Sequence, residues 1–297
     1  MFQLSPEVRK ALDRNRPVVA LESTLIAHGF DYPENIEVGR AVEAVVRDAG
    51  ATPATIAVVN GVIKVGITSD EMLEIAQNKT MPKLSLRDVP VAAGLKMWGA
   101  TTVASTAYIA SLAGIAVFST GGLGGVHRDA KESWDVSADL LALSQSPIVV
   151  VCSGVKSILD IRATLEVLES YNIPVVGYQT DRFPGFYVRD SGYQVPWQIN
   201  KPSEAAQIFR EQLALGMDSA LVVANPVPEK DAIAKEVHDM WIEKALAQLK
   251  RAKITGKAVT PFMLHNLKEI SDNNSVIANK SLILNNAALA AEIAKSI

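Results

Sequence analysis

Short runs of apolar, mostly β-branched residues recur along the chain and alternate with longer segments of helical periodicity. The runs are continuous rather than alternating, which is typical of strands covered on both faces. The predicted strands are Pro17–Leu21, Thr55–Val59, Ile115–Ser119, Ile148–Cys152, Pro174–Tyr178 and Ala220–Ala224. The predicted helices are Asn35–Ala49, Val103–Ala113, Ser157–Ser170, Ser203–Leu215 and Asp231–Arg251. This alternation predicts an α/β fold, layered α/β/α, with a central mixed, largely parallel sheet.

Turn and cap residues mark the ends of several predicted helices. Asn35 and Ser203 have side chains that suit helix N-caps. Gly50 and Gly216 stand where helices commonly stop in a left-handed conformation.

Two stretches depart from the alternation of strand and helix. Asn60-Gly61 joins two apolar runs and predicts a hairpin turn, and therefore an antiparallel pair at the edge of the sheet. After Asn225 the chain is helical in three segments that reach Ile297, which predicts a helical C-terminal cap across the sheet. Repeats and low-complexity linkers are absent from the sequence, so we expect a single domain over residues 1–297.

The composition is that of a globular protein without a basic surface for nucleic acids. Among 297 residues, 29 Lys and Arg stand against 32 Asp and Glu, for a formal charge of −3. Cys152 is the one cysteine, which excludes intrachain disulfides and cysteine-rich metal sites. The most apolar stretch, Val103–Phe118, is shorter than the roughly 20 residues that span a bilayer. Charges near residue 10 also argue against a signal peptide. We therefore expect a soluble, cytoplasmic protein with neither nucleic acid nor a membrane as partner.

Ligands in open α/β sheets gather at the carboxyl ends of the strands, so the residues that follow each strand are the candidates for chemistry. Glu22 follows the first strand, where a carboxylate at the rim of an apolar core suits a general acid. The alternative is that Glu22 caps a helix or pairs with an arginine. Lys83 and Arg87 lie close together and suit a phosphate or carboxylate, or they are solvated surface charges.

A glycine-rich loop, Thr120–Arg128, follows the strand Ile115–Ser119. Four glycines in the segment GGLGG allow backbone N–H groups to converge on an anion, although they also serve tight turns. The loop does not match the dinucleotide fingerprint, because His127 stands where the third glycine is required. It is not a P-loop either, because the required Gly-Lys-Ser/Thr end is absent.

Two aspartates and a lysine complete the candidates at the strand ends. Asp135 and Asp139 share a helix face if a helix opens there, with the Ser137 hydroxyl between them. Paired carboxylates suit Mg²⁺ or Mn²⁺, or they stabilise the dipole of the helix. Lys156 lies at a predicted strand-to-helix junction. There a partly desolvated amine attacks an aldehydic or anomeric carbon, or the lysine binds an anion.

Several long motifs resemble the pseudouridine-5′-phosphate glycosidases, also called the indigoidine-synthase-A-like family. They are VVALESTLIAHGFDYPEN, GATPATIAVVNGVIKVG, GATTVASTAYIASLAGIAVFSTGGLGGVHRDA, WDVSADL, CSGVKSILDIRATLEVLE, PVVGYQT, ALVVANPVPE and NNAALAAEIA. The resemblance runs from about Pro17 to Lys295. It implies an enzyme that reversibly cleaves pseudouridine 5′-phosphate to uracil and ribose 5-phosphate, with a divalent cation, usually Mn²⁺, and a homotrimeric assembly.

The resemblance also assigns roles to residues of this chain. It implies that Glu22 is the proton donor, Lys156 the covalent nucleophile and Asp135 the metal ligand. The substrate contacts that it implies are Lys83, Val103, Ser137, Ala138, Asp139 and Asn279. It leaves the role of His127 open.

The carbon–carbon bond of pseudouridine excludes the carboxylate-pair scheme of ordinary glycosidases. Our hypothesis is that Lys156 attacks the anomeric carbon while the ribose ring opens. Glu22 then protonates the uracil carbon, Asp139 handles proton transfers of the sugar and orients Lys156, and water hydrolyses the resulting imine.

Two other functions remain open from the residues. The first is an imine-forming aldolase or lyase on another sugar phosphate, which uses the same lysine, acid and phosphate contacts. The second is a phosphosugar-binding protein without catalysis, although a binding protein needs neither a strand-end acid nor a nucleophilic lysine. A nucleotide-dependent kinase is disfavoured because the sequence has no phosphate-transfer motif.

Overall fold

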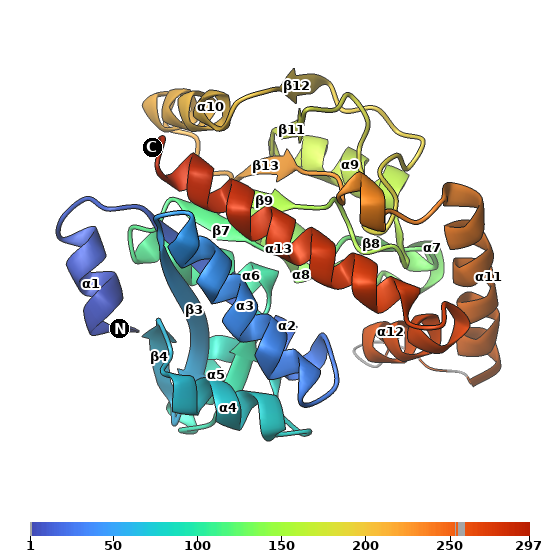
Figure 1. Ribbon diagram of the computed structural model, residues 1–297, viewed down its shortest axis with the longest axis horizontal. Coiled ribbons are helices and arrows are strands. Elements are labelled where there is room, and N and C mark those ends of the chain that lie inside the picture. Colours follow the sequence, from blue (N-terminus) through green and yellow to red (C-terminus); the bar gives the residue numbers. More distant parts are fainter. Residues whose placement is uncertain (1, 253, 255–258) are drawn as a thin grey trace.

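The computed structural model describes residues 2–252, 254 and 259–297 (Figure 1). In this part of the chain one large sheet has the strand order β1-β4-β3-β2-β7-β9-β13-β11-β12, and β5 and β6 pair beside β3. A separate small pair, β8 with β10, is antiparallel. The strands are β1 Phe2–Leu4, β2 Val18–Glu22, β3 Thr52–Val59, β4 Val62–Val65, β5 Lys83–Leu84, β6 Gly99–Thr101, β7 Val117–Ser119, β8 Val126–His127, β9 Val149–Cys152, β10 Leu159–Asp160, β11 Val175–Tyr178, β12 Trp197–Ile199 and β13 Leu221–Ala224.

Helices cover the sheet, with α3 and α13 in front of it and α6 and α8 behind it in Figure 1. The α-helices are α1 Pro6–Leu12, α2 Thr24–His28, α3 Glu34–Asp48, α4 Ser69–Gln77, α5 Val89–Gly94, α6 Val103–Leu112, α7 Ala130–Ser133, α8 Ala138–Leu143, α9 Ile161–Ser170, α10 Pro202–Ala214, α11 Lys235–Ala252, α12 Val259–Ile270 and α13 Asn274–Ala294. Short 3₁₀ helices are η1 Leu86–Asp88 and η2 Glu229–Asp231. The expected α/β fold, with a mixed, mostly parallel sheet and a helical C-terminal segment, is confirmed.

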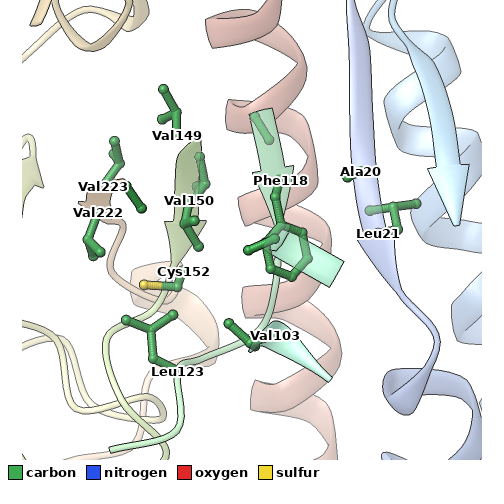
Figure 2. Close-up of a cluster of buried hydrophobic side chains, with 14 of the residues drawn as sticks. Ala20, Leu21, Val103, Phe118, Leu123, Val149, Val150, Cys152, Val222 and Val223 are labelled. Atoms are coloured by element: carbon green, nitrogen blue, oxygen red, sulfur yellow. The ribbon is translucent and has the colours of Figure 1, made fainter. Parts of the chain in front are cut away.

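All six predicted strands are present, and their apolar runs form the centre of the core. Figure 2 shows Phe118 of β7 and Val150 of β9 among other buried side chains of the sheet. Cys152 lies in the same cluster, and burial raises the pKa of its thiol to about 12. Continuous apolar runs were therefore the correct sign of strands covered on both faces.

The Asn60-Gly61 hairpin is also present, but it does not form the edge of the sheet. Both residues have positive φ, 49° and 79°, and Val59 lies opposite Val62 in an antiparallel pair. The edge prediction is wrong because β1 pairs in parallel with the outer side of β4.

Two predicted helices begin later than expected. The segment predicted as helix from Ser157 first makes the short strand β10, and α9 starts at Ile161 because the Asp160 carboxylate caps it by accepting from Ala163 N at 2.9 Å. Asp231, the predicted start of the next helix, is the last residue of the 3₁₀ helix η2, and α11 starts only at Lys235. There the N–H of Ile233 donates to the carbonyl of Tyr187, which holds the chain extended.

The predicted N-caps are wrong, whereas the predicted glycine stops are correct. Asn35 is buried inside the first turn of α3, where its amide donates to the carbonyls of Ile26 and Ala76. Ser203 lies inside α10, which begins at Pro202. Gly50 and Gly216 have φ of +87° and +71° just beyond α3 and α10. Side-chain type alone thus misled at Asn35, whose amide also bonds to neighbouring elements.

Helix α13 fulfils the prediction of a C-terminal helix across the sheet, since it packs on β2, β7 and β9. Among residues 2–252, 254 and 259–297, no helix combines the length and apolar character needed to cross a membrane.

Candidate active site

Three neighbouring parallel strands, β2, β7 and β9, end at one edge of the sheet. Glu22 is the last residue of β2, the glycine-rich loop follows β7, and Lys156 follows β9. Because the carboxyl ends of adjacent parallel strands meet, these three segments come together although they are far apart in the sequence.

Glu22 is held by two hydroxyl groups. Its side chain is buried, at 9% exposure, where an unpaired carboxylate is costly. The hydroxyl of Thr24 donates to Oε2, and the hydroxyl of Thr120 donates to Oε1. The carboxyl group is therefore fixed in position at the cavity described below.

Lys156 lies on a loop rather than at a helix N-terminus. Its backbone N–H donates to the carbonyl of Leu123 at 3.0 Å, which ties the lysine loop to the glycine-rich loop. Two residues earlier, Gly154 has φ of +78°, and a Cβ there would lie 2.0 Å from the carbonyl oxygen of Pro184. Only glycine fits this approach, so the path of the chain into Lys156 is fixed by backbone contacts.

Arg128 supports the same loop from its other side. Its guanidinium donates to the carbonyls of Ser157 and Ile158, each at 3.3 Å. The backbone on both sides of Lys156 is thus anchored to the segment that follows β7.

Asp139 is a buried bridge between three segments. Its Oδ1 accepts from the N–H of Ala104 at 2.9 Å, and its Oδ2 accepts from the N–H of Gly124 at 2.8 Å. A Cβ on Gly124 would lie 2.5 Å from the Asp139 carboxylate, so the glycine permits this close contact. Asp139 therefore joins α6, the glycine-rich loop and α8.

Most of the predicted site residues line one cavity of about 660 Å³, which we call the main cavity. It is a concave site with a few convergent polar groups, as expected of a small-molecule site. Its lining includes Glu22, Lys83, Arg87, Asp135, Ser137, Ala138, Asp139 and Lys156.

A narrower pocket of about 80 Å³, which we call the inner pocket, adjoins the main cavity. Glu22, Lys83 and Lys156 line both spaces. The inner pocket is further lined by His28, Gly121, Gly122, Phe186, Asn279 and Ile283. The predicted acid and the predicted nucleophile thus stand at the boundary between the two spaces.

A third hollow, the outer cleft, has a volume of about 470 Å³ and shares His28, Gly29 and Asn279 with the inner pocket. His265 of α12 also lines this cleft, where its side chain is largely exposed.

Val103 is the predicted site residue that lines none of these three spaces with its side chain. The side chain is 1% exposed and lies among the core residues, near Leu123 in Figure 2. The preceding residue, Thr102, lines the main cavity in its place. Only the main chain of Val103 remains to meet a bound substrate.

Asp135 does not share a helix face with Asp139, because α8 begins only at Ala138. Its carboxylate is 36% exposed and lies 3.8 Å from Nε2 of His127. Within the described residues, no three His, Cys, Asp or Glu side chains gather around one point. One accessible carboxylate in a polar cavity fits a hydrated Mg²⁺ or Mn²⁺ ion, which keeps most of its waters.

Two buried polar atoms in the inner pocket have no hydrogen-bond partner. They are Nε2 of His28 and Oδ1 of Asn279. Burial and the positive charge of Lys83 lower the pKa of His28, and a hydrogen bond with the backbone of Met81 opposes them. The imidazole is consequently neutral near pH 7.

A family model described as "Indigoidine synthase A like protein" matches residues 7–296. The chain belongs to the indigoidine synthase A-like family. The resemblance expected from the sequence motifs is thereby confirmed.

Curated relatives in the indigoidine synthase A-like family carry the name pseudouridine-5′-phosphate glycosidase. The protein of Symbiobacterium thermophilum is 50% identical to this chain and covers 99% of it, with 97% of its own length matched. The protein of Alkaliphilus metalliredigens is 48% identical, with 99% of this chain and 95% of its own length matched.

Two solved structures resemble the whole chain. One is the prealnumycin C-glycosynthase AlnA in complex with ribulose 5-phosphate, with a TM-score of 0.92, 38% identity and coverage of 100% of this chain and 96% of that one. The other is an indigoidine synthase A-like protein of Thermotoga maritima, with a TM-score of 0.88, 37% identity and coverage of 95% and 93%. Both identities are high enough to support the family as well as the fold.

The sequence did not reveal several side chains that the structure places around the site. They are His28, Thr24, Thr120 and Arg128. Thr24 and Thr120 flank strand ends, which was a usable signal, because a buried carboxylate requires donors. His28 and Arg128 act across elements, and nothing in their local sequence indicated this.

Proposed function

We propose that the chain catalyses the reversible cleavage of pseudouridine 5′-phosphate to uracil and ribose 5-phosphate. The observation that carries the proposal is that Glu22 and Lys156 line both the main cavity and the inner pocket. A base in the inner pocket and a sugar phosphate in the main cavity would place the bond between them beside both residues. The names of the relatives support the substrate, since they are pseudouridine-5′-phosphate glycosidases.

The carbon–carbon bond requires a covalent route, because protonation of a ring nitrogen or oxygen does not release a carbon leaving group. The amine of Lys156 bonds to the anomeric carbon and the ring C–O bond breaks. Glu22 then protonates C5 of uracil. The lone pair of the lysine nitrogen forms an imine, and the electrons of the broken C–C bond restore the uracil double bond. Water hydrolyses the imine and releases ribose 5-phosphate.

The phosphate belongs in the main cavity, where Lys83 and Arg87 supply positive charge. The glycine-rich loop contributes less than its sequence suggested, because the N–H groups of Leu123, Gly124 and Val126 donate to other groups of the protein. Binding energy from the remote phosphate supports the reaction at the anomeric carbon.

In the proposed reaction Asp139 has a positioning role. Each of its carboxylate oxygens already accepts a backbone N–H, which supports a role in fixing the loops around Lys156 more than a role in carrying the protons of the sugar. Ser137 caps α8 beside it and, with Ala138, lines the sugar side of the cavity.

Asp135 would hold a divalent cation such as Mn²⁺, mainly through the water shell of the ion. Such an ion supplies positive charge for the oxygens of the substrate.

A homotrimeric assembly, a single domain over residues 1–297 and a cytoplasmic location remain predictions from the sequence and the resemblance.

The proposed function predicts that purified protein mixed with ribose 5-phosphate, uracil and Mn²⁺ forms pseudouridine 5′-phosphate. Chromatography measures uracil consumption and product formation, with a chelator as the control for the metal. Lys156→Ala should abolish product formation while ribose 5-phosphate still binds, and exposed Lys201→Ala is the matched control. Near-normal turnover in Lys156→Ala would contradict the covalent route.

The alternative function is that of a Schiff-base lyase or aldolase that acts on another sugar phosphate. Borohydride trapping of ribose 5-phosphate on Lys156, without any uracil-dependent product, would favour that alternative. Uracil-dependent product would exclude it as the explanation of the site.

A further inference from the structure

The outer cleft has no part in the chemistry described above, yet it meets the inner pocket. The two spaces share His28, Gly29 and Asn279 in their linings. The main cavity meets the inner pocket elsewhere, at Glu22 and Lys156. Among the described residues, none lines both the main cavity and the outer cleft. The inner pocket therefore lies between two larger spaces, and only one of them has a role so far.

The proposed reaction requires a second opening of the inner pocket. When the carbon–carbon bond has broken, ribose 5-phosphate remains bonded to Lys156. Because Lys156 lines both the main cavity and the inner pocket, this adduct occupies the passage between them. Uracil in the inner pocket then needs another way out. In the reverse reaction uracil likewise has to arrive when the sugar is already bonded to the lysine.

An ion pair joins the two walls of the outer cleft. One wall comes from α2 and the segment after it, which carries Asp31, and the other includes Lys268 of α12. Nζ of Lys268 donates to Oδ2 of Asp31 at 2.6 Å. This hydrogen bond lowers the pKa of Asp31 and raises that of Lys268, so both groups are charged near pH 7.

The ion pair is exposed enough to open readily. The side chain of Asp31 is 76% exposed and that of Lys268 is 34% exposed. Exposed ion pairs contribute little net stability, because water and salt screen them. The contact between the two walls can therefore break and form again while the rest of the fold stays intact.

We propose that the outer cleft is the route by which uracil enters and leaves the inner pocket, and that the Asp31–Lys268 pair closes it between turnovers. The sugar phosphate uses the main cavity. Polar side chains along the cleft, among them Gln77, Asn78 and Ser275, suit the passage of a base that forms hydrogen bonds. This inference rests on the proposed function and adds to it a separate route for each product.

The first test uses the wild type in the reverse reaction, with uracil held constant and ribose 5-phosphate increased. With two routes, the rate reaches a plateau and stays there in large excess of ribose 5-phosphate. With one route, sugar bonded to Lys156 blocks the entry of uracil, so excess ribose 5-phosphate inhibits in competition with uracil. Such inhibition of the wild type would overturn the proposal without any variant.

The second test closes the outer cleft covalently. The double variant Asp31→Cys with Lys268→Cys is treated with a short bis-maleimide reagent, and the buried thiol of Cys152 does not react. We expect cross-linking to lower the rate of synthesis at saturating ribose 5-phosphate by about tenfold or more, because uracil can no longer reach the pocket. Excess ribose 5-phosphate should now inhibit. Borohydride trapping of ribose 5-phosphate on Lys156 should keep its rate, since the sugar enters through the main cavity.

A second exposed ion pair provides the matched control. Glu7 of α1 and Arg47 of α3 lie 2.8 Å apart with side chains 52% and 44% exposed, and they line none of the three spaces. Cross-linked Glu7→Cys with Arg47→Cys should keep both the rate of synthesis and the rate of trapping. Each double variant is compared with itself before and after cross-linking, so any effect of the substitutions cancels.

The outcomes separate this inference from the function on which it rests. A wild type that forms no uracil-dependent product overturns both. An active wild type that excess ribose 5-phosphate inhibits in competition with uracil overturns the separate route alone. Equal rates of synthesis before and after cross-linking of Asp31→Cys with Lys268→Cys, with the cross-link verified by mass spectrometry, also overturn the separate route alone.

Discussion

At the scale of single residues, the site depends on partners that satisfy buried polar groups. Glu22 is buried, at 9% exposure, and the hydroxyls of Thr24 and Thr120 donate to its two carboxylate oxygens. Asp139 is satisfied instead by two backbone amides. Hydroxyl donors can turn as the carboxyl group gains or loses a proton, whereas backbone amides cannot. This difference suits Glu22 to proton transfer and Asp139 to holding the loops in place.

We expect Thr120→Val to lower kcat in both directions by about tenfold, because Oε1 of Glu22 loses its donor and the carboxyl group loses its fixed orientation. Steady-state kinetics with pseudouridine 5′-phosphate measures the effect. Thr80→Val makes the same change at an exposed position that lines neither the main cavity nor the inner pocket, and it is the control. An unchanged kcat in a folded Thr120→Val variant would show that this hydroxyl is unnecessary.

At the scale of elements, α13 is joined to the strand ends by one buried side chain. Asn286 donates to the carbonyl of Thr120 at 2.9 Å and to the hydroxyl of Ser153 at 3.1 Å, and it accepts from the amide of Asn225 at 2.9 Å. These partners follow β7, β9 and β13 respectively. The amide of Asn286 therefore fixes the position of α13 relative to the strand ends that carry the site.

We expect Asn286→Leu to lower the free energy of unfolding by about 2–3 kcal/mol, since several buried groups lose their partner. The neighbouring Asn285 makes one bond of 3.2 Å to the carbonyl of Pro226, so Asn285→Leu should cost less than about 1 kcal/mol. Urea denaturation of both variants gives the comparison. Equal losses for the two variants would contradict the role assigned to Asn286.

The elements that the sequence predicted are those whose signal is local. The strands β2, β3, β7, β9, β11 and β13 were predicted because burial on both faces requires an unbroken apolar run. The starts of α9 and α11 were wrong because pairing of β10 with β8, and a bond from Ile233 to Tyr187, override the local pattern. Glu22 and Lys156 were found as residues that follow strands. His28 was missed as a site residue because no local pattern shows that it lines the inner pocket. It does so together with Asn279 of α13, which follows about 250 residues later in the sequence.

At the scale of the whole molecule, two buried histidines couple folding to pH. Burial is the largest cause that lowers the pKa of both His28 and His238. Nε2 of His238 is also buried and unpartnered, and its Nδ1 lies 3.2 Å from the carboxylate of Asp239. Above their ordinary pKa of 6.5 both histidines are neutral in the folded and unfolded chains. Below it the unfolded chain takes up protons that the folded chain resists.

The free energy of unfolding should therefore fall as the pH drops from about 7 towards 5. The lowered pKa values of Asp31, Glu71 and Asp239 act in the same direction at lower pH, because these carboxylates stabilise the folded chain only while ionised. Urea denaturation at pH 8, 7, 6 and 5 measures the slope. His238→Leu should flatten it, whereas the same change at exposed His265 should not. A slope that is identical in the wild type and in His238→Leu would contradict the assignment.

The burial of Cys152 has a practical consequence for spectroscopy. The chain has one thiol, it lies in the centre of the sheet, and its pKa of about 12 leaves almost no thiolate at neutral pH. The native protein therefore provides a background that maleimide dyes and spin labels leave unmodified. A cysteine introduced at exposed Trp134, which lines the main cavity, would become the sole labelled position and would report on ligand entry without removal of any native residue of the core.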